Sequence, residues 1–204
     1  MATKFGEELM EQRLELVTLA RDLHADGRLS DVEMARVVKT PAVRVHPLVF
    51  LAEQKLGDAA APGKQLEMDD LLSWLGGKVG QSVYEIDPLK INVTAIAEVM
   101  SRAFAERHRI LAVEVTDKEV VIASSEPFLR AWESNLEHVL RKRVRRVLTD
   151  PRAIARHTAE FYTMAGSVNR ARGTERSESG AGVTNLEQML ELGSMKEPDA
   201  NDQH

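Results

Sequence analysis

The sequence has no cysteine and few aromatic residues. Among its 204 residues, none is cysteine and only 4% are Phe, Trp or Tyr. The absence of cysteine excludes disulfide bonds, thiolate metal ligands and a cysteine nucleophile. Because aromatic rings are scarce, a core must be built mainly from Leu, Val, Ile, Ala and Met side chains. At 43% hydrophobic residues, the chain has enough apolar side chains for such a core.

Long apolar runs and an excess of positive charge are also missing. No stretch approaches the roughly 20 apolar residues that a membrane-spanning helix needs, and the first residues lack the apolar segment of a secretory signal. The formal net charge of −5 gives no overall attraction to nucleic-acid phosphates or anionic lipids. We therefore expect a cytoplasmic protein that neither inserts into a membrane nor binds nucleic acid.

The first part of the chain has the pattern of a helical hairpin. Leucines recur at helical spacing over residues 9–23. Gly27 suits the end of this helix, because glycine adopts the left-handed conformation without a steric penalty. Residues 30–33, Ser-Asp-Val-Glu, have the S-x-x-E pattern of a capping box, which predicts that a second helix begins there.

A second pair of helices is predicted further along. Residues 48–52 form an apolar helical stretch, and residues 66–75 form an amphipathic helix that Gly76 and Gly77 close. We therefore predict a helical N-terminal subdomain over residues 1–80, made of two short hairpins that stack on each other.

From residue 81 the pattern changes to alternating strands and helices. The predicted strands cover residues 83–86, 111–115, 120–123 and 144–148, and the predicted helices cover residues 93–108, 127–140 and 151–165. The order β-α-β-β-α-β-α describes a split βαβ arrangement, in which helices cover a small sheet. The predicted fold class is therefore α+β, with an α/β domain at residues 81–165.

After Ala165 the chain loses its apolar pattern. Residues 166–185 are rich in Gly, Ser, Arg and Glu, a composition typical of a flexible linker. A brief amphipathic stretch follows around Leu190 and is too short to fold alone. We therefore expect residues 166–204 to be a linker that leads to a further domain.

Fragments of a phosphate-binding loop occur at two places. The pattern G-x-x-x-x-G-K-[ST] is absent; Gly63-Lys64 and Gly76-Gly77-Lys78 are the nearest sequences. Neither fragment follows a strand or supplies the hydroxyl that binds magnesium. A turn and a helix end are the structures that these two fragments predict.

The histidines and paired acids do not form a recognisable site. The histidines are His24, His46, His108, His138, His157 and His204, and no two are spaced i, i+4, so the sequence does not predict a zinc site. We expect His108 to interact with the C-terminal dipole of its helix, and Asp69 and Asp70 to lie in a helix first turn. We assign no catalytic, cofactor-binding or metal-ligating residue.

The densest charge feature is the basic run at residues 141–146, Arg-Lys-Arg-Val-Arg-Arg. It could contact phosphates or an acidic protein surface, or it could be a solvated helix end and edge strand. The acidic chain as a whole favours a protein partner over nucleic acid. Phe128 and Trp132, near this run, are expected to be core residues.

Several short motifs follow one another along the second half of the chain. They lie at residues 84–91 (YEIDPLKI), 99–101, 105–108, 114–116, 120–123, 124–128 (SSEPF) and 160–162 (EFY). In this order they resemble the N-terminal domain of type II secretion and type IV pilus ATPases, the GspE/PilB group. The likeness covers about residues 46–165, and residues 199–204 resemble the stretch that continues into the ATPase portion.

The resemblance implies a role in recruitment and regulation. In that family the N-terminal region docks onto the cytoplasmic domain of an inner-membrane platform protein, which is GspL-like in type II systems. A C-terminal RecA-like domain, assembled as a hexamer, hydrolyses ATP to drive pseudopilus assembly and secretion. The motifs of that domain do not occur in this sequence, so we expect no enzyme activity from it. Its expected partners are a GspL-like protein and its own C-terminal ATPase domain.

A related domain of this superfamily binds cyclic di-GMP through R-L-G-x-x-L-x-x-x-G repeats. Residues 18–40 keep the apolar skeleton of that repeat. However, Thr18 replaces the arginine and Ala20 replaces the first glycine. The arginine would contact guanine or phosphate, and the glycine would permit close backbone approach. A cyclic di-GMP-sensing module of a type IV pilus-type ATPase is therefore the alternative function.

Overall fold

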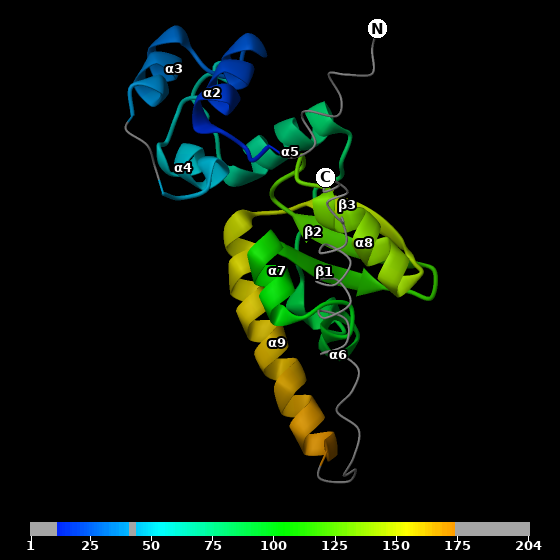
Figure 1. The fold of residues 1–204 in the computed structure, drawn as a ribbon. Helices are drawn as coiled ribbons and strands as arrows, with labels where there is room; N and C mark the ends of the chain where they lie inside the picture. The colour runs from blue at the N-terminus through cyan, green and yellow to red at the C-terminus, as the bar shows by residue number, and fades with distance from the viewer. Residues whose placement is uncertain (1–11, 41–43, 174–204) are drawn as a thin grey trace, which may run out of the picture.

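The computed structural model describes residues 12–40 and 44–173 and shows two subdomains, one above the other (Figure 1). Within the described residues, the upper one contains the helices α2 (Leu16–Ala25), α3 (Asp31–Val38), α4 (Pro47–Glu53) and α5 (Met68–Val79). Helix α2 packs on α3, and α4 packs on both α5 and α2. These contacts form the two stacked hairpins that the leucine spacing predicts.

The turn between α2 and α3 follows its sequence signals with one change. Gly27 has a φ of 71°, and the Ser30 hydroxyl accepts a hydrogen bond from the Glu33 amide at 3.3 Å. The Glu33 carboxyl does not accept the hydrogen bond from the Ser30 amide that a full capping box requires. It accepts a hydrogen bond from the Gly57 amide at 2.6 Å instead. The predicted capping box is therefore only half formed, because Glu33 joins one hairpin to the other.

A charged pair also links the two hairpins. The Arg28 guanidinium donates two hydrogen bonds, of 3.0 and 2.8 Å, to the two carboxyl oxygens of buried Asp58. The hydrogen bond from Arg28 is the main reason why the pKa of Asp58 is lowered. Such a two-pronged geometry holds both backbone segments in one orientation.

Two helix boundaries in this subdomain differ from the predicted ones. Helix α2 begins at Leu16, so residues 12–15 are not helical; residues 9–11 lie outside the described part of the chain. Helix α5 does not close at Gly76-Gly77 but continues to Val79 and ends at Gly80, whose φ is 66°. The helix ends at Gly80 because this residue adopts the left-handed conformation. Gly76 and Gly77 are helical, so the presence of glycine alone does not end the helix.

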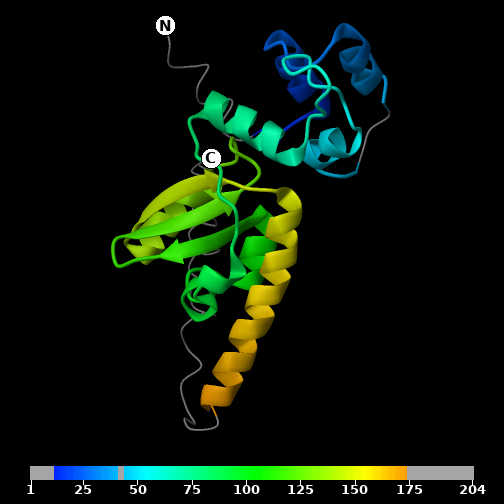
Figure 2. The same ribbon diagram turned by 180° about the vertical axis from the view of Figure 1, so that it is seen from behind.

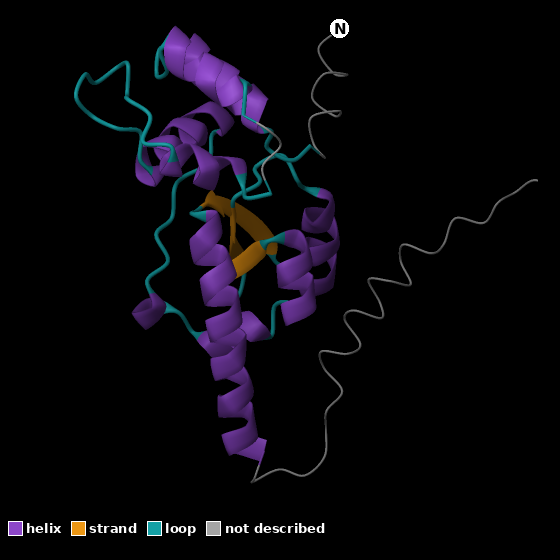
Figure 3. Ribbon diagram, turned by 90° about the vertical axis from the view of Figure 1, so that its left-hand side faces the viewer, coloured by secondary structure: helices purple, strands orange, loops and turns teal. Residues whose placement is uncertain are grey.

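The lower subdomain contains the sheet and the remaining elements. Those elements are η2 (Pro88–Lys90), α6 (Val93–Ala97), α7 (Arg102–His108), β1 (Ile110–Val115), β2 (Glu119–Ser124), α8 (Ala131–Leu140), β3 (Arg143–Leu148) and α9 (Pro151–Gly173). The strand order is β1-β2-β3, with β2 antiparallel to β1 and parallel to β3. Residues 120–124 of β2 are all buried, as expected for a central strand covered on both faces (Figure 3). The predicted α+β class is confirmed.

The prediction of a first strand at residues 83–86 is wrong. Only Val83 pairs with the sheet, through an isolated parallel bridge to Leu148 at the end of β3. In that register, residues 85 and 86 would face Asp150 and Pro151, where the chain already turns into α9. The ladder cannot continue there, because β3 has ended and proline has no amide hydrogen.

The predicted helix 93–108 is two helices, and α8 starts later than predicted. The Ser101 hydroxyl accepts a hydrogen bond from the Phe104 amide at 3.1 Å, so a new helix, α7, begins there. Helix α8 begins at Ala131, not near Pro127. Trp132 is buried, as expected, whereas Phe128, also expected in the core, is only partly buried.

Helix α9 is longer than predicted. It continues through residues 166–173, which were expected to belong to the flexible linker. Hydroxyl groups of Thr163 and Ser167 bond to carbonyls one turn earlier along this stretch. Figures 1 and 2 show the helix beginning beside the upper subdomain, passing the sheet and extending beyond it. The other residues of the predicted linker, 174–204, lie outside the described residues.

Two hydrophobic cores correspond to the two subdomains. One contains Leu23, Leu48 and Leu71 of the helices, and the other contains Ile122, Trp132 and Phe161 around the sheet. Leu148, the last residue of β3, is fully buried in the helical core. The end of the strand therefore inserts into the upper subdomain.

The close approach at Gly76 gives a stability test. A Cβ added there would lie 2.7 Å from the backbone oxygen of Gln81, whereas a Cβ at Gly77 meets nothing within 4 Å. We predict that Gly76→Ala lowers the free energy of unfolding by about 1–3 kcal/mol. The control Gly77→Ala should leave it unchanged or raise it by up to about 1 kcal/mol. Urea denaturation measures both, and equal effects would contradict the close approach.

Candidate functional site

The two phosphate-loop fragments are structural. Gly63 has a φ of 88° and forms a turn, and Lys64 lies 3.5 Å from an Asp70 carboxyl oxygen. Lys78 pairs with Asp26 at 2.9 Å, and Gly76-Gly77 lies within α5. Neither lysine therefore belongs to a loop of backbone amides that could surround a phosphate.

The predicted helix-terminal residues are found where expected, with one difference. Asp69 and Asp70 lie in the first turn of α5, and Asp70 accepts a hydrogen bond from the Glu67 amide at 3.2 Å. His108 lies in the last turn of α7, but burial, followed by the charge of Arg107, lowers its pKa. The lowered pKa makes the charged imidazolium less favourable, which weakens the expected interaction with the helix dipole. The helix ends at Arg109, whose φ is 53°.

Two arginines of the basic run are paired with neighbouring acids. Arg145 pairs with Glu119 at 2.9 Å, and Arg146 lies 3.3 Å from Glu133. Lys142 donates a hydrogen bond to the Thr116 carbonyl at 2.7 Å. These contacts favour the structural interpretation of the run, in which its charges brace an edge strand and the loops beside it.

The junction of the two subdomains contains a buried carboxyl group. Glu126, in the loop after β2, is only 2% exposed. It accepts a hydrogen bond from the Leu14 amide at 2.8 Å, and its other oxygen lies 3.3 Å from His46 Nε2. Leu14 precedes α2 and His46 caps α4, so one side chain of the lower subdomain contacts two segments of the upper one.

The orientation of His46 is set from both sides of its ring. Its Nδ1 accepts a hydrogen bond from the Leu48 amide at 3.3 Å, so Nε2 carries the ring hydrogen that faces Glu126. Nε2 and the Glu126 oxygen do not form a hydrogen bond, and Nε2 has no other partner among the described residues. Arg13, Arg44 and Arg109 line the same depression and provide a positive surrounding for Glu126.

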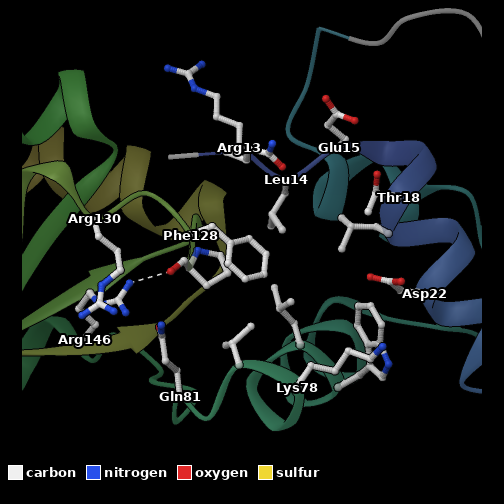
Figure 4. A pocket seen from close by; sticks show the side chains of 16 residues that line it. Arg13, Leu14, Glu15, Thr18, Asp22, Lys78, Gln81, Phe128, Arg130 and Arg146 are labelled. Carbon is white, nitrogen blue, oxygen red and sulfur yellow. Dashed lines mark hydrogen bonds between the residues drawn. The ribbon is translucent and has the colours of Figure 1, made fainter. Parts of the chain in front are cut away.

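A cleft of about 440 Å³ lies on another side of this junction (Figure 4). Leu14, Trp74 and Phe128 contribute apolar walls, while Arg130 and Arg146 line one side. These two guanidinium groups share Glu133, and Arg146 also donates to the Pro127 carbonyl at 2.7 Å. Burial lowers the pKa of Arg146.

The opposite wall of the cleft has its own paired charges. Thr18 and Asp22 of α2 line this wall together with Lys78 of α5. Lys78 is already bound to Asp26, which also accepts a hydrogen bond from Trp74 Nε1 at 2.7 Å. The hydrogen bonds from Lys78 and Trp74, in that order, lower the pKa of Asp26. Lys78, Arg130 and Arg146, the cationic groups on these two walls, are therefore each already paired with a carboxyl group.

The described residues contain no group of three or more His, Asp or Glu side chains placed to hold a metal ion. Within the same residues, no helix is both long and apolar enough to cross a bilayer. The site that the structure does present, the junction at Glu126, was not identified from the sequence. The available signal was a glutamate directly after the apolar strand 120–123, within the motif at residues 124–128.

One domain family and one curated protein match this chain in sequence. Residues 79–168 match the MshEN domain. The chain is also 37% identical over 187 residues to the type IV pilus assembly ATPase TfpB of Acinetobacter baylyi. That alignment covers 88% of this chain and 31% of the relative, so the chain spans about a third of the length of the curated relative it matches.

Two solved structures have a similar arrangement of elements. The structure of MshE with cdg is 16% identical, with a TM-score of 0.47 over 74% of this chain and 100% of that chain. The structure of the N-terminal domain of XpsE is 15% identical, with a TM-score of 0.46 over 74% of this chain and 97% of that chain. Both TM-scores lie below 0.5, so neither likeness bears on function.

Removal of the Glu126 carboxyl group tests the junction. Glu126→Ala leaves the buried Leu14 amide without its acceptor, which costs about 1–3 kcal/mol of unfolding free energy. We expect Glu126→Gln, which keeps an acceptor oxygen, to lose less. Glu85→Ala, at an exposed carboxyl group, is the control and should change stability by less than about 0.5 kcal/mol. Urea denaturation in which all three variants behave alike would show that Glu126 does not join the subdomains.

Proposed function

We propose, on the premise that the chain is an N-terminal domain of a GspE/PilB-like ATPase, that it recruits that ATPase to an inner-membrane platform protein. The chain provides the docking surface, and the ATP-hydrolysing domain belongs to the same full-length protein. The module acts in the cytoplasm and is peripheral to the inner membrane through its partner. The isolated chain is not expected to hydrolyse ATP.

The observation that carries this proposal is the 37% identity over 187 residues to a pilus assembly ATPase. The alignment includes both subdomains, so the helical hairpins are part of the shared unit as well as the sheet. A relative named for type IV pilus assembly favours a pilus system. Our expectation from the sequence, a GspL-like partner of a type II secretion system, stays a prediction.

Helix α3 is the surface that we assign to docking. It packs chiefly on α2, and Glu33 and Arg36 bond to residues 54–57, but part of its surface faces solvent. Val32 of this helix is 79% exposed, and Val38 is also exposed. Exposed branched apolar side chains on a short helix are suited to bury against a partner, because their χ1 angle is already restricted.

A binding measurement with the cytoplasmic domain of the cognate platform protein tests this proposal. We predict that the 204-residue chain binds this domain and that Val32→Asp weakens binding by about tenfold or more, since a charge would be buried in the contact. Leu89→Asp is the matched control, because Leu89 is 96% exposed on the lower subdomain. It should bind like the unaltered chain.

Biolayer interferometry with both partners folded measures these affinities, and platform proteins of type II secretion and type IV pilus systems serve as separate arms. The arm that binds identifies the system. Absence of binding in both arms would refute recruitment. If Val32→Asp and Leu89→Asp weaken binding equally, α3 is not the docking surface.

Cyclic di-GMP sensing is the second candidate function. The cleft of about 440 Å³ beside α2 favours it, because the altered repeat position Thr18 lines that cleft. Against it, Thr18 lacks the arginine guanidinium, and the Asp22 carboxyl group lines the same cleft and would repel a phosphodiester (Figure 4). We predict no binding heat when cyclic di-GMP is titrated into the chain by calorimetry. Saturable heat in the micromolar range would instead support the sensor.

A further inference from the structure

A second cavity at the junction is lined by hydroxyl groups that have no partner. Its volume is about 480 Å³, and it lies between the start of α4 and the start of α9. Ser125 is 1% exposed and Thr158 is 2% exposed. Neither hydroxyl group has a hydrogen-bond partner among the described residues. A buried hydroxyl without a partner is costly, so two of them lining one cavity indicate a ligand that accepts hydrogen bonds.

These hydroxyl groups are not arranged as nucleophiles. Because neither Ser125 nor Thr158 is hydrogen-bonded to a histidine or an acid in the described chain, neither has a general base. Ser125 directly follows β2, and Thr158 is on the face of α9 that also presents Ile154 and Ala155 to the cavity. The two donors therefore come from rigid elements and are suited to binding.

Three guanidinium groups line the same cavity. Arg44 and Arg109 form no ion pair among residues 12–40 and 44–173, whereas Arg152 is paired with Asp150 at 2.9 Å. Glu106 is the one carboxyl group in the lining, and it is engaged with Arg102 at 2.7 Å. The cavity lining thus has two guanidinium groups without an ion-pair partner among these residues, beside two unpartnered hydroxyl groups.

The helix that forms one wall adds to the positive field. Helix α9 has 23 residues and begins at Pro151, which lines the cavity. The N-terminal end of a long helix carries a partial positive charge and favours anions. Apolar side chains, Val45, Val49 and Ile154, complete the lining, so the anion would be partly shielded from water.

We propose that this cavity is a binding site for a phosphate group, either as inorganic phosphate or as the end of a small phosphate ester. Arg44 and Arg109 supply charge, while Ser125 and Thr158 donate hydrogen bonds. All four groups line one cavity and can donate hydrogen bonds to the oxygens of a phosphate group. The site is separate from the α3 docking surface and from the cleft of Figure 4, which is lined by other residues.

Titration of the isotope-labelled 204-residue chain with inorganic phosphate and, separately, with glycerol phosphate tests the site. We expect saturable changes in the amide NMR signals of Ser125 and Thr158. Ser125→Ala and Thr158→Val each remove one hydroxyl group with little change of volume and should weaken binding by about tenfold. Tighter binding of glycerol phosphate than of phosphate would identify an ester as the ligand, and equal binding would identify the free anion.

A comparison of Arg44→Gln with Arg21→Gln distinguishes binding at the cavity from a general effect of positive charge on phosphate binding. Both arginines are exposed and each substitution removes one positive charge, but only Arg44 lines the cavity. We expect Arg44→Gln to weaken phosphate binding about tenfold and Arg21→Gln to leave it unchanged. If neither anion gives saturable shifts, or if Arg21→Gln weakens binding as much as Arg44→Gln, the proposed site does not exist. Because two independent hydroxyl variants are used, misfolding of one still leaves the other as a test.

Discussion

The arrangement of this molecule depends on a carboxyl group buried between two hydrophobic cores. Glu126 extends from the sheet subdomain and is met by the Leu14 amide and by His46 of the helical subdomain. A buried carboxyl group is costly unless it is bonded, so the two subdomains are held in the one orientation that satisfies it. Leu148, which ends β3 inside the helical core, adds apolar contact to the same junction. Both cavities described above are formed by this orientation.

A rigid junction suits a recruitment module. If the helical subdomain binds a partner through α3, a fixed junction transmits the position of that partner to the sheet subdomain and to α9. Helix α9 itself extends beyond the sheet (Figure 2). A phosphate group bound between α4 and α9 would contact both subdomains at once and would therefore stabilise this same orientation.

Local sequence patterns predicted most helices and strands correctly. They predicted less well where each element ends and which strands pair. Leucine spacing identified the helical hairpins, and the apolar runs at 111–115 and 120–123 identified β1 and β2, because periodicity reports directly which face is buried. The strand at 83–86 failed because pairing depends on where its neighbour ends, and β3 ends at Leu148. The junction was not predicted, since Glu126, Leu14 and His46 are far apart in sequence and no local signal connects them. The partners of the basic run, such as Glu133, were hidden for the same reason.

Hydrogen exchange at the Leu14 amide tests the junction most directly. Leu14 precedes α2, so no helix bond protects its amide, and its one acceptor is the Glu126 side chain of the other subdomain. If the two subdomains form one body, this amide should exchange as slowly as amides of the α2 core, and Glu126→Ala should bring it close to the rate of an unstructured peptide. Fast exchange in the unaltered chain would mean that the subdomains separate freely, and the account of a fixed docking module would be wrong.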